Sequence, residues 1–174
     1  MPGEKIKITR ADQSHAAQLA ALAIATFRDT FGPVNKQEDM DKYVAEEMNI
    51  NKLTEELNDP DNLFFLAWSN NEMIGYVKLR IHKEPEELRN NKPIEIERIY
   101  VLQEQQGKKI GAALMSRSIA NAKDNHHDVI WLGVWEHNHS AISFYKKWGF
   151  ELFGSHPFVL GNDAQTDVLM KKTL

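Results

Sequence analysis

The chain has 174 residues, of which 26% are charged and 42% hydrophobic, and its formal net charge is -4. It has no cysteine, which excludes disulfides and thiolate metal sites, and the acidic balance argues against a nucleic-acid partner. No apolar stretch is long enough for a signal sequence or a bilayer span. We expect residues 1–174 to form one domain of a cytoplasmic protein without a membrane partner.

Alternating and 3.6-residue apolar patterns predict the elements in chain order. The first half predicts a strand at 5–10, a helix capped by Asp12 or Ser14 and ended by Gly32-Pro33, one or two polar helices within 36–59, and strands at 63–68 and 73–80. The second half predicts a strand at 93–101, a helix at 110–122, a buried strand at 129–134, a helix from Ser140 to Trp148, and strands at 150–153 and 166–170. Strands alternate with helices only in the second half. The fold class is therefore α/β, with a mixed, mostly antiparallel sheet of six to seven strands and about four helices.

The segment from Lys36 to Asp61 is strongly acidic. It holds nine acids and three lysines, so its charge is 3 - 9 = -6. A solvated helical face is the ordinary interpretation of such a pattern. The other interpretation is an acidic entrance for a cationic substrate.

A polar loop follows the strand predicted at 93–101 and leads into the next helix. Gly107 and Gly111 let a ligand or a neighbouring backbone approach closely. The first turn of a helix has unpaired N–H groups and a partial positive charge, which suit a pyrophosphate. The loop is not a P-loop, because Lys108 is followed by Lys109 and not by Ser or Thr. An ordinary turn between strand and helix remains the alternative.

Two motifs in the second half resemble those of the GNAT family of N-acetyltransferases. The family pattern Gln/Arg-x-x-Gly-x-Gly/Ala corresponds here to Gln106-x-x-Lys109-x-Gly111. The pattern Asn-x-x-Ala-x-x-Phe-Tyr, followed by Gly-Phe, corresponds to Asn138-x-x-Ala141-x-x-Phe144-Tyr145 and Gly149-Phe150. Lys109 replaces the first family glycine and could either strengthen phosphate binding or narrow the loop. The segment 95–101 also resembles the PaiA branch of polyamine acetyltransferases.

The resemblance implies a GNAT-like sheet and acetyl-CoA as co-substrate. It implies that the backbone of Ile99 and Val101 pairs with the pantetheine arm and that the Val101 N–H receives the thioester oxygen. Asn138 would hold the pantetheine or a water, or else cap a loop. The pyrophosphate is expected on the loop residues Gln106, Gly107, Lys108, Lys109, Ile110 and Gly111.

Amide formation needs a base for the ammonium and an acid for the leaving thiolate. Glu97 is the candidate base, directly or through a water, with Glu95 in reserve. Regular alternation would put both on the face of Ile99 and Val101. A glutamate that is exposed or paired with Arg98 or Lys78 is the alternative. Tyr145 is the candidate acid, and its neighbour Phe144 is expected to be the packing residue of that helix.

Direct attack within a ternary complex is expected, because the chain has no cysteine nucleophile. The acceptor is expected to be a small primary amine, and a polyamine such as spermidine fits a cationic substrate. A protein N-terminus or a lysine side chain remains open, as does a non-catalytic acyl-CoA sensor on the same fold. No metal is expected, because His126, His127, His137 and His139 lie in predicted loops without ligand spacing. The sequence also leaves a homodimer open.

Overall fold

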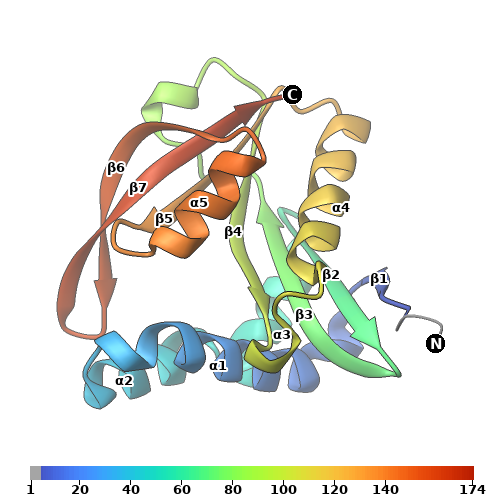
Figure 1. The fold of residues 1–174 in the computed structure, drawn as a ribbon, viewed down its shortest axis with the longest axis vertical. Helices are drawn as coiled ribbons and strands as arrows, with labels where there is room; N and C mark the ends of the chain where they lie inside the picture. The colour runs from blue at the N-terminus through green and yellow to red at the C-terminus, as the bar shows by residue number, and fades with distance from the viewer. Residues whose placement is uncertain (1–4) are drawn as a thin grey trace.

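The computed structural model describes residues 5–174, and residues 1–4 lie outside it. Its sheet has seven strands in the order β1-β2-β3-β4-β5-β7-β6 (Figure 1). The strands are β1 (Lys7–Arg10), β2 (Asn62–Ser69), β3 (Glu72–Arg80), β4 (Pro93–Val101), β5 (Val129–Trp135), β6 (Glu151–Leu160) and β7 (Asp163–Thr173). The α-helices are α1 (Ala16–Phe31), α2 (Gln37–Glu47), α3 (Ile50–Asn58), α4 (Ile110–Asp124) and α5 (His139–Lys147). Only β4 and β5 pair in parallel, which confirms the mixed, mostly antiparallel sheet.

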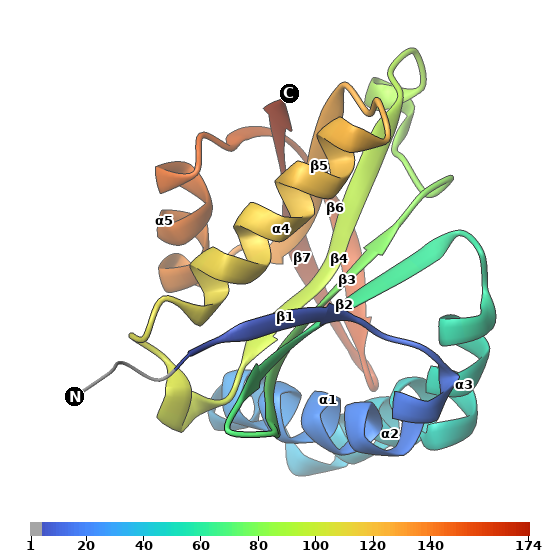
Figure 2. The ribbon, with the colours of Figure 1, turned by 90° about the vertical axis from the view of Figure 1, so that its right-hand side faces the viewer.

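The helices cover both faces of the sheet (Figure 2). The helices α4 and α5 lie on one face, where Ile96 and Leu114 belong to the same buried cluster. The other face carries α1, α2 and α3, whose buried side chains include Leu19 and Leu53, packed with Tyr76 of the sheet. No helix within residues 5–174 is long and apolar enough to cross a membrane.

Two expectations about the last third of the chain were wrong. The cap of α5 is Asn138 and not Ser140, because the Asn138 side chain accepts the N–H of Ala141. The strands β6 and β7 are also longer than predicted and form one hairpin. Gly154 and Pro157 interrupt the apolar pattern of β6, yet β6 is the edge strand, where a missing ladder donor is tolerated.

A β-bulge in β4 opens the middle of the sheet. Arg98 lies opposite Lys78 and Ile96 lies opposite Leu79, so Glu97 is the extra residue. The pairing of β4 with β5 also stops at Ile96. Beyond that point the two strands diverge (Figure 1). The next part of β4 therefore has a partner on one side only.

Candidate active site

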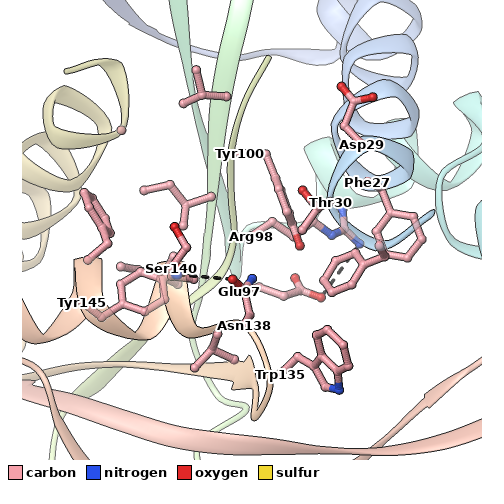
Figure 3. Close-up of a pocket in the computed structure, with 18 of the residues that line it drawn as sticks. Phe27, Asp29, Thr30, Glu97, Arg98, Tyr100, Trp135, Asn138, Ser140 and Tyr145 are labelled. Carbon is pink, nitrogen blue, oxygen red and sulfur yellow. Dashed lines mark hydrogen bonds and ion pairs between the residues drawn. The ribbon is translucent and has the colours of Figure 1, made fainter. Parts of the chain in front are cut away.

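A cavity of about 830 Å³ occupies the gap between the diverging strands. Figure 3 shows Tyr145 on one side of it and Phe27 on the other, with Glu97 between them. The sequence-predicted residues that line it are Glu97, Ile99, Val101, Gln106, Gly107, Lys109, Ile110, Gly111, Asn138 and Tyr145. Lys108 does not line the cavity; it is exposed, and its Nζ lies 2.9 Å from Gln105 Oε1. The fold thus brings nearly all the predicted site residues together.

The edge of β4 presents backbone groups to this gap. Leu102 donates its N–H to Ile74 O of β3 at 2.9 Å. Successive N–H groups of a strand point to opposite neighbours, so the N–H groups of Val101 and Ile99 point away from β3. They face the place where β5 would continue the ladder. These two donors are therefore available to an extended ligand.

The loop after β4 forms a second set of backbone donors. Gly107 has φ 82°, and Lys109, the N-cap of α4, is left-handed with φ 63° and ψ 20°. The first hydrogen bond of the helix runs from Ala113 N–H to Lys109 O at 3.1 Å. The N–H groups of Ile110, Gly111 and Ala112 precede this bond and have no helical partner. Together with the helix dipole they suit an anion.

Lys109, which stands where the family motif has glycine, adopts a left-handed conformation that favours glycine. A left-handed residue with a Cβ costs about 1–2 kcal/mol. Lysine at this position therefore carries a cost in stability that glycine would not. The Lys109 side chain is exposed beside the cavity that the loop lines.

The helix α5 brings Asn138, Phe144 and Tyr145 to the cavity. Asn138 is a helix cap, as the alternative interpretation had it, and it also lines the cavity. Tyr145 is only 8% exposed and belongs to the core cluster, whereas Phe144 is half-buried. Phe144 was expected to be the packing residue and Tyr145 the polar one, but Tyr145 is the more buried of the two, because the core lies under it. Burial raises the pKa of the Tyr145 phenol well above its ordinary value.

Glu97 lies in a buried ionic cluster. It contacts Lys78 Nζ, and its Oε1 lies 3.0 Å from Arg80 Nη1 and 3.9 Å from Arg98 Nη2. Arg98 makes a paired contact with Glu56 of α3, at 2.8 and 3.1 Å. Burial raises the pKa of Glu97, but the charges of Arg98, Lys78 and Arg80 outweigh it, so this pKa lies below its ordinary value. The salt-bridged interpretation of Glu97 is therefore observed.

The expected face of Glu97 was wrong, because the bulge breaks the alternation of β4. Ile99 and Val101 pack on the α4 side with the first cluster. Glu97 and Arg98 both lie on the opposite face, toward α3. Glu95 shares that face and binds Arg80, and burial raises its pKa.

Comparisons with known proteins agree with this geometry. The model of the acetyltransferase (GNAT) family matches residues 20–150. An uncharacterised N-acetyltransferase of Lactobacillus delbrueckii subsp. lactis is 37% identical over 169 residues, which cover 97% of this chain and 98% of the relative. An uncharacterised N-acetyltransferase of Mycobacterium tuberculosis is 30% identical over 160 residues, covering 91% of this chain and 97% of the relative.

The chain belongs to the GNAT acetyltransferase family. Its fold is also similar to the crystal structure of PaiA N-acetyltransferase from Thermoplasma acidophilum in complex with coenzyme A. The TM-score is 0.81 at 23% identity, and the match covers 98% of this chain and 99% of that chain. This GNAT protein is an N-acetyltransferase, and its family uses acetyl-CoA.

The other half of the cavity lies beyond Glu97, toward α1 and the β6–β7 hairpin, and is called the acceptor half below. Sequence reasoning missed it, because its residues come from distant segments with no common motif. Its aromatic side chains are Phe27, Phe31, Tyr43, Tyr100, Trp135 and Phe158. Phe27 and Tyr43 stack with centroids 4.6 Å apart. An aromatic wall of this kind binds an apolar surface or the face of a cation.

None of the nine acids between Lys36 and Asp61 lines the cavity. Asp39 accepts the N–H of Asn162 at the tip of the β6–β7 hairpin, and Asp41 pairs with Arg28. Glu56 is buried against Arg98. The acidic segment therefore serves the surface and the packing of α2 and α3. It is not wholly the solvated face of the ordinary interpretation, because Asp39 and Glu56 are buried. Among residues 5–174 no cluster of three or more His, Asp or Glu side chains could hold a metal.

Proposed function

We propose that this GNAT protein transfers the acetyl group of acetyl-CoA to a primary amine by direct attack within a ternary complex. The observation that carries the proposal is the gap between β4 and β5, which joins an open backbone edge to an aromatic acceptor half in one cavity. A co-substrate lying along β4 would place its reactive end between the two halves. The amine would then reach the thioester without a covalent enzyme intermediate.

The backbone and Tyr145 have distinct parts in this reaction. The Val101 N–H points into the gap and would stabilise the thioester oxygen as it gains charge, an effect worth about 3–4 kcal/mol for one donor. Tyr145 would give its proton to the departing thiolate. Its raised pKa keeps the phenol protonated at neutral pH, which an acid requires. Donation then depends on the thiolate lying close to the hydroxyl.

Glu97 would act through a water. A carboxylate whose pKa is lowered by Arg98, Lys78 and Arg80 is ionised at neutral pH and is a weak base. It can still accept hydrogen bonds from a water or from the amine. An alkyl ammonium with a pKa near 10.4 must lose its proton before attack, which costs about 4–5 kcal/mol at pH 7.

The acceptor that the cavity supports best is a primary amine on an apolar or aromatic body. The aromatic side chains of the acceptor half carry this choice. A polyamine such as spermidine is the second candidate, because Asp29 and Glu97 line the same half and β4 resembles the PaiA branch. Release of thiol from acetyl-CoA with 2-phenylethylamine and with spermidine, at low and high salt, separates the two. A preference for spermidine that salt erodes would favour the polyamine.

The Tyr145→Phe variant tests the chemistry. It removes one proton donor and keeps the ring, so kcat should fall by about 10²–10⁴-fold when thiolate departure limits the rate. Acetyl-CoA affinity by calorimetry and the melting temperature should stay near those of the wild type. Unchanged kcat would show that Tyr145 is not the acid. If the protein bound acetyl-CoA but released no thiol with any primary amine, peptide or lysine, it would instead be the non-catalytic sensor.

A further inference from the structure

A histidine and an aspartate face each other on the wall of the acceptor half. His156 Nε2 of β6 lies 3.7 Å from Asp167 Oδ2 of β7, and both residues line the cavity. The two are direct cross-strand partners, and Asp167 is also the partner of Trp135 on β5. Directly opposed residues of neighbouring strands project from the same face of a sheet. Trp135, Asp167 and His156 therefore form a row across three strands, on the acceptor face.

Because Gly133 has no side chain, the side chains of this pair can occupy the space above β5. A Cβ built on Gly133 would lie 3.4 Å from both His156 Nε2 and Asp167 Oδ2. The space above this position is therefore occupied by the imidazole edge and the carboxylate. Gly133 itself lines the cavity just after the point where β4 and β5 separate. The pair thus lies beside the gap in which the reaction is proposed to occur.

The surroundings of His156 differ from those of Glu97. The Glu97 carboxylate is shared among Lys78, Arg80 and Arg98, so its oxygen lone pairs are already engaged by cationic groups. Among residues 5–174, His156 has one charged partner, Asp167, and its side chain is 42% exposed. Asp167 is 15% exposed and is held by the sheet. A carboxylate beside one ring nitrogen orients an imidazole and stabilises its protonated form, as in other His–Asp pairs.

We propose that His156, oriented by Asp167, takes the proton that the acceptor ammonium loses, while Glu97 only holds the water or the amine. This inference rests on the proposed acetyl transfer. The ammonium gives one proton to His156, and the freed electron pair forms the C–N bond as the C–S bond breaks. The second nitrogen proton restores the phenol after Tyr145 has protonated the thiolate. His156 returns its proton to solvent, so atoms and charge balance.

The charged groups facing this pair define the expected pH dependence. Besides Asp167, the cavity is lined by Glu95 and Glu97 of β4 with Arg80 and Arg98, by Asp29 of α1 and by Lys109 before α4. The helix α2, which packs on β6, contributes Tyr43 and no charged side chain. Neutral His156 can accept a proton and imidazolium cannot. Activity should therefore fall at acid pH, where imidazoles in general take up a proton.

The experiment compares His156→Gln with Glu97→Gln between pH 5.5 and 9. It uses the amine among 2-phenylethylamine, spermidine and a lysine peptide that releases thiol fastest. His156→Gln should lower kcat/KM about 10²-fold at pH 7. The residual activity should follow the concentration of free amine and so rise with pH where the wild type is level, which makes the defect shrink as pH rises. The lowered pKa of Glu97 keeps it ionised across this range. The defect of Glu97→Gln should therefore be the same factor at every pH.

The Asp167→Asn variant supplies a measurement that does not depend on the acceptor. Loss of the carboxylate should lower the pKa of His156, followed by NMR of the ring protons, and should shift the acid limb of kcat/KM to lower pH. His137→Gln, a change at an exposed histidine outside the cavity, is the matched control and should alter neither. A purely structural role of the pair would change stability without moving the limb.

Two results would overturn the inference. One is a His156→Gln enzyme with wild-type kcat/KM and acid limb; the other is a His156 pKa that Asp167→Asn leaves unchanged. A pH-dependent defect in Glu97→Gln alone would assign the proton to Glu97. All three leave acetyl transfer itself intact. Failure of the proposed function is distinct, because it would be the absence of thiol release with every amine although acetyl-CoA binds.

Discussion

The two halves of the cavity are built in different ways. The half proposed to bind acetyl-CoA, called the co-substrate half, uses backbone: the N–H groups of Ile99 and Val101, and the first turn of α4 behind the loop at 106–111. The acceptor half uses side chains, with aromatic rings and a buried ionic cluster around Arg98. A backbone site needs only a suitable conformation, and many residue types supply one. A side-chain site depends on the identity of each residue.

This difference predicts which substitutions matter in each half. In the acceptor half, truncation of one buried charge should cost stability, because its partners remain charged. In the co-substrate half, a substitution should matter only if it blocks the ligand or changes the backbone. The following variants test this contrast, from the largest expected effect to the smallest.

Arg98→Met should have the largest effect. It keeps the aliphatic volume and leaves Glu56 and Glu97 with fewer cations, which should lower the free energy of unfolding by about 3–5 kcal/mol. Urea denaturation measures it. Adding Glu56→Gln should recover part of the loss, because the pair is coupled. Arg89→Met is the control, since the Arg89–Glu86 pair is exposed, and it should change little. Equal effects of the two arginine changes would contradict a buried ionic cluster.

Gly111→Glu should weaken acetyl-CoA binding by at least about 100-fold, because a carboxylate beside the phosphates repels them at a cost of several kcal/mol. Gly111→Ala is the matched control. A Cβ at Gly111 would lie 3.8 Å from Phe144 Cζ, an ordinary contact, so the alanine variant should bind normally. Calorimetry measures both affinities. If the glutamate variant bound acetyl-CoA as tightly as the wild type, the phosphates would not bind at this loop.

Lys109→Gly should have the smallest effect and should act in two directions. Removal of the left-handed lysine should raise the free energy of unfolding by about 1 kcal/mol. Loss of the positive charge should weaken acetyl-CoA binding several-fold if the side chain contacts a phosphate. In Lys109→Asn the asparagine tolerates the same left-handed conformation and has no charge. Its affinity for acetyl-CoA should match that of the glycine variant. Unchanged affinity in both would limit the role of Lys109 to the backbone.

The residues predicted for the co-substrate half meet at one cavity because their sequence signals are local. Gly107, Gly111 and the strand before them lie within one segment, and the strand order follows from the alternation of patterns. Ten of the eleven predicted co-substrate and catalytic residues line the cavity. Lys108 did not, because the loop turns its side chain toward Gln105. A loop motif does not say which of two neighbouring lysines faces the ligand.

Most of the acceptor half could not be predicted from the sequence, and the reason is physical. Phe27, Trp135 and Phe158 come from three distant segments, and each is consistent with ordinary packing. His156 and Asp167 lie in strands whose length was underestimated, so their cross-strand pairing could not be anticipated. The bulge at Glu97 was also missed. The sequence places Glu95, Glu97, Ile99 and Val101 at regular alternate positions. In the sheet, the one extra residue of the bulge breaks this alternation.

That bulge places a trade-off between stability and function at a single backbone position. Without Glu97, Ile94, Ile96, Ile99 and Val101 would follow one uninterrupted alternation with the same inward face. Such a β4 could continue its ladder beside β5, and the sheet would gain hydrogen bonds. It would also close the gap that admits the co-substrate. Deleting Glu97 would therefore probe the backbone as substitution cannot: a chain one residue shorter should be a more regular β-sheet and no longer an acetyltransferase.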